Sequence, residues 1–188
     1  VHKFNTVYGN TLTEPLIMLP SNRACMRLPG IDGKAKMSKS LGNCIYLSDE
    51  TEEIKAKVMS MFTNPNHLRV QDPGKVDGNP VFIYLEAFSR PEHFEEFLPE
   101  YNGLDELKEH YKSGGLGDVK VKKFLNSVMQ KELAPIRERR KMWEKRLPEV
   151  YDILRAGTET AKKVAAETLH DVHHAMQIDY FESKDFRR

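Results

Sequence analysis

The chain has 188 residues, of which 39% are hydrophobic and 30% are charged, and its formal net charge is +1. This balance is ordinary for a globular protein, and the net charge alone does not indicate a nucleic-acid partner. No apolar run approaches the ~20 residues that span a bilayer. Cys25 and Cys44 lack the spacing of a metal site, so we expect reduced thiols in a cytoplasmic protein.

The first 47 residues are expected to be rich in loops. Val1–Tyr8 has the apolar spacing of a helix that ends at Gly9, and its start without an initiator methionine predicts a missing upstream part. Two short apolar runs, Pro15–Leu19 and Cys44–Leu47, are typical of buried strands. Two short strands do not form a stable sheet alone, which again predicts missing upstream strands.

A glycine- and lysine-rich stretch, GIDGKAKMSKSLGN (residues 30–43), lies between these runs. Six Lys and Arg residues precede residue 48 against two acidic residues, a local positive charge that suits an anionic ligand. Lys36 and Lys39 are three positions apart, so one turn of chain can aim both ammonium groups at one side while Met37 anchors inward. Flexible ammonium groups of this kind can follow a phosphate chain that moves. On composition alone, an exposed loop with incidental lysines remains the alternative.

The remainder of the chain predicts helices. A capping-box-like pair, Asp49 and Glu52, precedes a helix with apolar residues on one face at Ile54, Val58, Met61 and Phe62. Thr63–Pro80 is rich in Asn, Asp, Pro and Gly and is expected to be an irregular connector and domain junction. Further helices are expected over Asn79–Phe88, Pro91–Tyr101, Leu104–Ser113, from Asp118 across a kink at Pro135, over Pro148–Ala156, and over Thr158–Gln177. The helix from Asp118 is expected to carry one apolar stripe, formed by Val121, Leu125, Val128, Met129 and Leu133.

The letters KMSKS at Lys36–Ser40, followed by LGN, are the second signature motif of class I aminoacyl-tRNA synthetases. The flanking LPGIDGKAKMSKSLGNCIYLSD resembles the bacterial tryptophanyl-tRNA synthetases. Further stretches resemble them in the same order: DPGKVDGNPVFIYLEAF, GDVKVKKFL, LAPIRERR and AGTETAKKVAAETL. The resemblance covers about Val1 to Gln177 and corresponds to the C-terminal half of that family. The HIGH-type motif and the tryptophan pocket would lie upstream.

The resemblance implies a loop that grips the ATP phosphates, with Mg²⁺ accompanying ATP. Lys36 and Lys39 would be the catalytic cations that stabilise the departing pyrophosphate. Met37, Ser38 and Ser40 would complete the ATP-binding loop, with hydrogen bonds from the serines and from backbone amides. The backbone near Met26 and Leu28 would contact adenine.

The resemblance also implies the fold and the partners. The fold would be mainly α: a helical, anticodon-binding-like bundle over residues 71–188, preceded by a short remnant of a Rossmann-like α/β nucleotide-binding domain over residues 1–70. The full-length protein would be a homodimeric tryptophan–tRNA ligase of protein biosynthesis, forming Trp-AMP and transferring tryptophan to tRNA(Trp). The 188 residues alone are expected to be inactive.

Two alternatives stay open. The chain could come from another class I synthetase, tyrosyl or methionyl, or it could be a stand-alone helical RNA-binding module with a relic KMSKS motif. Cations at Arg137–Arg146, and the lysines at Lys120, Lys122 and Lys123, are interpreted as a solvated helix face. His170 and His174 lack a third ligand in sequence, so no metal site is expected.

Overall fold

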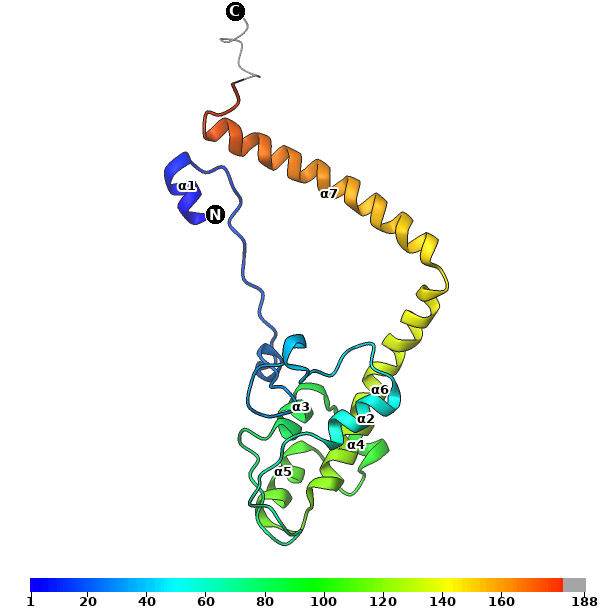
Figure 1. The fold of residues 1–188 in the computed structure, drawn as a ribbon. Coiled ribbons are helices and arrows are strands. Elements are labelled where there is room, and N and C mark those ends of the chain that lie inside the picture. The colour runs from blue at the N-terminus through cyan, green and yellow to red at the C-terminus, as the bar shows by residue number, and fades with distance from the viewer. Residues whose placement is uncertain (181–188) are drawn as a thin grey trace, which may run out of the picture. The chain divides into compact units, whose positions relative to one another are not determined.

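The computed structural model describes residues 1–180 of the chain. This part is mainly helical and contains no β-strand, only one isolated antiparallel bridge between Pro29 and Lys36 (Figure 1). The helical elements in chain order are α1 (His2–Tyr8), η1 (Arg23–Met26), η2 (Lys39–Leu41), α2 (Thr51–Met59), α3 (Pro80–Phe88), α4 (Pro91–Phe97), α5 (Leu104–Ser113), α6 (Asp118–Glu144) and α7 (Leu147–Ala175).

The chain divides into two compact units. One consists of Leu19–Met142 and holds the hydrophobic core, and the other consists of Val1–Met18 together with the described residues from Trp143 onward. In the first unit, side chains of α2, α3, α5 and α6 form the centre of the core, and Ile54, Leu85, Leu107 and Leu125 are all fully buried. The expected apolar stripe of α6 is confirmed, since all of its members are buried: Val121, Leu125, Val128, Met129 and Leu133.

The starts of α2 and α3 follow from local side-chain chemistry. The predicted start of α3 is confirmed: Asn79 is the N-cap, its Oδ1 accepts the Val81 N–H at 3.0 Å, and Pro80 occupies the first turn. The predicted start of α2 is wrong by one residue, because the capping box joins Glu50 and Glu53. Asp49 instead accepts the Tyr46 N–H at 2.8 Å and pairs with Lys57 at 2.5 Å.

The two expected strands are absent from the described residues. Residues 15–19 have no regular structure, and Leu16, Ile17 and Met18 are almost fully exposed. Residues 44–47 form no strand either, although Cys44 is buried. A strand needs a hydrogen-bonding neighbour, and the described part of the chain offers none to either run. The Rossmann-like remnant is therefore not seen as a sheet.

Two expected helix boundaries are also wrong. Residues 148–177 were expected to form two helices separated at Gly157, but α7 continues through this glycine to Ala175. A glycine within a helix costs only about 1 kcal/mol relative to alanine, so it does not by itself end a helix. Helix α4 ends at Phe97, four residues before the expected Tyr101.

Several other helical expectations are confirmed. Gly9, with a φ of 86°, follows the end of α1, and α5 has its predicted bounds. Helix α6 begins at the predicted Asp118 and continues past Pro135. Within residues 1–180 no helix is long and apolar enough to cross a membrane. The end of the chain, residues 181–188, lies outside the described residues.

Lys122 corrects one interpretation of the cations. It was assigned to a solvated face, but it is buried, and its ammonium donates to the carbonyl oxygens of Met59 at 3.1 Å and Met61 at 2.6 Å. Burial lowers the pKa of Lys122. Arg137 is also buried and donates to Gln130 Oε1 at 3.1 Å. These two cations therefore belong to the packing of α6 and are not free surface charges.

Candidate functional site

The lysine-rich stretch begins as a tight backbone turn. The Met37 N–H donates to the Leu28 carbonyl at 3.3 Å, and the Gly30 N–H donates to the Ala35 carbonyl at 2.8 Å. Gly33 occupies the tip with a φ of 67°, and a Cβ there would approach the Phe62 ring to 2.9 Å. Only glycine combines this left-handed conformation with so close a neighbour.

After the turn, the chain forms the short helix η2. The helix begins after Ser38 and ends at Leu41, and the next residue, Gly42, lies in the left-handed region with a φ of 64° and a ψ of 13°. The Gly42 N–H donates to the Lys39 carbonyl at 3.1 Å. The hydroxyl oxygens of Ser38 and Ser40 lie 2.9 Å apart. The motif Lys36–Ser40 thus spans the end of the turn and the first two residues of η2.

Lys36 and Lys39 carry exposed side chains on this loop. Among residues 1–180, the structure shows no ion pair and no side-chain hydrogen bond for either ammonium group. Elsewhere in this unit many exposed lysines are paired, for example Lys120 with Glu100 at 2.6 Å and Lys112 with Glu109 at 2.9 Å. The two loop cations are therefore available to an anion from solution.

The segment before the loop is attached to α3. Asn22 caps η1, because its Oδ1 accepts the Ala24 N–H at 3.0 Å, and its Nδ2 donates to the Glu86 carbonyl at 2.8 Å. The Tyr84 hydroxyl donates to the Pro29 carbonyl at 2.8 Å. Burial, with a smaller contribution from Cys44, raises the pKa of Tyr84 above its ordinary value of 10.0, so the hydroxyl stays a proton donor. The base of the loop is thereby held to the core.

The structure brings most of the predicted site residues together. Leu28 is half-buried and joins Met37 through the backbone hydrogen bond described above, and the two side chains share one cavity with Tyr84. This cavity measures about 360 Å³ and is mainly apolar. Met37 thus points inward, as the sequence predicts, while the lysines on either side stay exposed. Met26 lies upstream at the end of η1 with an exposed side chain.

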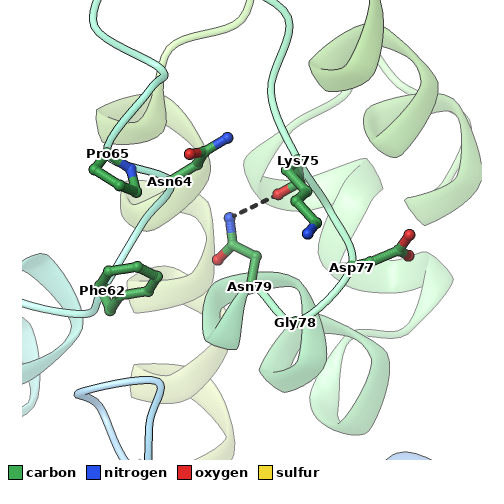
Figure 2. Close-up of a pocket in the computed structure, with 7 residues that line it drawn as sticks. All are labelled: Phe62, Asn64, Pro65, Lys75, Asp77, Gly78 and Asn79. Carbon is green, nitrogen blue, oxygen red and sulfur yellow. Dashed lines mark hydrogen bonds between the residues drawn. The ribbon is translucent and has the colours of Figure 1, made fainter.

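A second pocket lies along the connector before α3. Figure 2 shows its seven lining residues, and the cavity measures about 330 Å³. The Asn79 amide donates to the Lys75 carbonyl at 3.4 Å across this pocket, which holds the connector against the start of α3. None of the site residues predicted from the sequence lines it: the lining consists of Phe62, Asn64, Pro65, Lys75, Asp77, Gly78 and Asn79.

Comparison with known proteins assigns the fold and the loop to a family. Residues 2–134 match the family described as tRNA synthetases class I (W and Y). The chain belongs to this family. Curated relatives of the chain include the tryptophan–tRNA ligases of Clostridium longisporum, 54% identical, and Streptococcus mutans, 52% identical, each matched over 96% of the chain. The chain spans about half the length of these relatives, 50% and 52% respectively.

Solved class I synthetases share the fold. A crystal structure of the tryptophanyl-tRNA synthetase of Campylobacter jejuni, complexed with ADP and tryptophan, aligns with a TM-score of 0.66 at 24% identity. A second structure of that enzyme aligns with a TM-score of 0.61, also at 24% identity. The alignments cover 94% and 93% of this chain and 50% of each solved chain. At this identity the likeness shows the fold alone.

Two residues that hold the candidate loop were not identified from the sequence. The helical spacing of the residues around Tyr84 indicates a core position, but it does not indicate which acceptor its hydroxyl bonds. Asn43, which is buried behind the loop, had a local signal, because asparagine side chains commonly bond nearby backbone groups in turns. In the described part of the chain, no group of three or more His, Cys, Asp or Glu side chains is arranged for a metal ion.

Proposed function

We propose that this chain is the part of a tryptophan–tRNA ligase that carries its ATP-phosphate loop and its helical tRNA-binding region. The observation that carries the proposal is a KMSKS loop in which Lys36 and Lys39 are exposed and have no partner among residues 1–180, while the methionine between them is half-buried. Relatives about 50% identical along nearly the whole chain support tryptophan as the amino acid.

The loop chemistry follows from where charge develops in adenylation. The carboxylate of tryptophan attacks the α-phosphorus of ATP, the bond to the bridging oxygen breaks, and pyrophosphate departs with its electron pair. Lys36 and Lys39 would approach the phosphate oxygens that gain negative charge, with hydrogen bonds from Ser38, Ser40 and backbone amides. Preorganised cations that contact charge formed only in the transition state lower the barrier more than they tighten ground-state binding.

The remaining partners belong to the same proposal. Mg²⁺ enters with ATP, because this ion commonly binds substrate phosphates together with water and few protein ligands. The backbone around Met26 and Leu28 would contact adenine. We assign residues 1–70 to the catalytic domain and residues 71–188 to the binding of tRNA(Trp). This division is made by the ligand that each part would bind, and its boundary differs from that between the two compact units. The complete enzyme would be a cytoplasmic homodimer, and the 188 residues alone would be inactive.

Replacing Lys39 by alanine in the full-length enzyme tests the proposal. We expect the tryptophan-dependent ATP–pyrophosphate exchange rate to fall about a hundredfold, the scale of losing one transition-state donor. Lys34→Ala is the matched control, because Lys34 is equally exposed in the same loop but lies outside the motif. An unchanged rate in Lys39→Ala, or an equal loss in both variants, would contradict the assignment.

Measuring exchange with each amino acid separates the alternatives. A response to tyrosine but not tryptophan would replace the proposed amino acid. Exchange by no amino acid, together with RNA binding, would favour a helical RNA-binding module with a relic motif. Tryptophan-dependent exchange by the isolated 188 residues would contradict the expectation that they are inactive.

A further inference from the structure

The side chain of Asn43 lies buried behind the lysine-rich loop and joins three of its segments. Its Oδ1 accepts the Ser38 N–H at 2.8 Å. Its Nδ2 donates to Asp32 Oδ1 at 3.2 Å and to the Lys36 carbonyl at 3.4 Å. The amide oxygen can only accept and the amide nitrogen can only donate, so these three partners are satisfied in this orientation of the amide and not in the flipped one. A single side chain thus bonds the backbone on both sides of Met37.

The backbone of Asn43 extends this network to the core. Its carbonyl accepts the Ile31 N–H at 3.0 Å, and the Ile31 carbonyl accepts the Phe62 N–H at 2.8 Å, just after the end of α2. Ile31 therefore connects Asn43 to the chain that leaves α2. These hydrogen bonds hold the base of the loop to the core, in addition to the covalent attachment at its two ends.

The fit around the amide is close. A Cβ on Gly30 would lie 2.1 Å from Asn43 Nδ2 and 2.6 Å from Asp32 Oδ1, both far inside van der Waals contact. The backbone of Gly30 thus packs directly against the amide. The position of Asn43 is restricted by packing as well as by hydrogen bonds, so small changes in its charge or shape cannot be absorbed by a simple shift.

We propose that Asn43 is a positioning residue for adenylation, which holds the backbone of Lys36 and Ser38 so that the ammonium groups of Lys36 and Lys39 meet the leaving pyrophosphate together; this inference rests on the proposed function. The Lys36 carbonyl and the Ser38 N–H are both bonded to the amide, and η2, which carries Lys39, begins directly after Ser38. Catalytic groups must keep their mutual geometry within a fraction of an ångström to retain their effect.

The substitution Asn43→Asp tests this role with minimal change of shape. One carboxylate oxygen still accepts the Ser38 N–H, while the other replaces a donor with a negative acceptor facing Asp32 and the Lys36 carbonyl. Adding Asp32→Asn to Asn43→Asp restores the hydrogen bond between positions 32 and 43, with position 32 now the donor and position 43 the acceptor. The matched control is Asn79→Asp, because Asn79 is equally buried but caps α3.

Each variant is made in the full-length enzyme, and single-turnover formation of Trp-AMP is measured at saturating ATP over a range of tryptophan concentrations. We expect Asn43→Asp to lower the limiting rate at least tenfold with little change in the tryptophan concentration that gives half of it. The double variant should recover part of the rate, and Asn79→Asp should keep it. A rate unchanged by Asn43→Asp, or a loss equalled by Asn79→Asp, would overturn the inference.

Combination with Lys39→Ala distinguishes positioning from a general structural role. If Asn43 acts through the lysines, Asn43→Asp should cost much less in the Lys39→Ala background than alone. Full additivity of the two losses would overturn the inference. If Asn43→Asp melts below the assay temperature, Asn43→Ser, which adds no charge, is measured in the same cycle. An unchanged rate in Lys39→Ala itself refutes the proposed function, whereas a slow Lys39→Ala beside a fully active Asn43→Asp refutes only the positioning role.

Discussion

Replacing Lys122 by methionine is expected to weaken the attachment of α2 to α6. The ammonium of Lys122 donates to the carbonyls of Met59 at 3.1 Å and Met61 at 2.6 Å, at and just beyond the C-terminal end of α2. These carbonyls have no partner within the helix. Methionine retains the packing of the stem and removes only the charged donor, so the variant isolates the hydrogen bonds.

The magnitude follows from opposing contributions. Each hydrogen bond from a charged donor contributes roughly 1.5–3 kcal/mol, and a cation at a helix C-terminus adds about 0.3–1 kcal/mol. Desolvation of the ammonium opposes them, as the lowered pKa of Lys122 indicates. We therefore expect Lys122→Met to reduce the local free energy of unfolding by about 2 kcal/mol, equivalent to about 30-fold faster amide exchange in α2.

The assay is amide hydrogen exchange measured by mass spectrometry on peptides covering α2 and α6. Fluorescence of Trp143 is unsuitable, because this only tryptophan belongs to the other compact unit. Lys123→Met is the matched control, since Lys123 is the exposed neighbour of Lys122 on the same helix. Equal exchange rates in α2 for the two variants would refute the reasoning.

Three further substitutions test the core and the base of the loop. Tyr84→Phe should cost about 1 kcal/mol by removing the bond to Pro29. Because burial raises the pKa of Tyr84, the folded protein keeps a proton that the unfolded chain loses, so stability should fall as pH rises above 10.0. This loss of stability with pH, measured from the midpoints of urea unfolding, should be smaller in Tyr84→Phe than in the unsubstituted protein. An equal loss in both proteins would contradict the role given to the Tyr84 proton. Gly74→Ala places a Cβ 2.2 Å from the tyrosine ring of α5, so it should reduce stability by about 1–3 kcal/mol. The melting temperature should fall, and an unchanged melting temperature would contradict this close packing. Leu85→Ala should reduce the free energy of unfolding by about 2–5 kcal/mol, whereas Leu41→Ala, at an exposed position, should reduce it by less than about 0.5 kcal/mol. Similar losses in the two variants would contradict the assigned core.

Local signals in the sequence were sufficient for most helices. The Asn79–Pro80 pair predicted the start of α3, and the spacing of apolar residues predicted the buried face of α6. Both depend on interactions between residues a few positions apart, which the order of residues alone specifies. The predicted helix end at Gly157 is wrong, because a single glycine is a weak local signal and does not end a long helix.

The candidate site was predicted in part. The motif at Lys36–Ser40 identified the loop, and the inward methionine and the outward lysines agree with the structure. The catalytic roles of these residues stay predictions. The bond from Tyr84 to Pro29 joins positions 55 residues apart, and no spacing rule connects them. Such contacts arise only when separate segments pack together.

The sequence by itself determined the family, the position of the loop and the amphipathic faces of the helices, because these depend on residue identity and short spacing. Only the tertiary structure decided which polar groups became buried. Lys122 appears in sequence as one of several similar lysines, yet it alone among its neighbours at positions 120 and 123 is buried against backbone carbonyls. Its burial depends on where α2 ends relative to α6, which is a property of packing between distant segments.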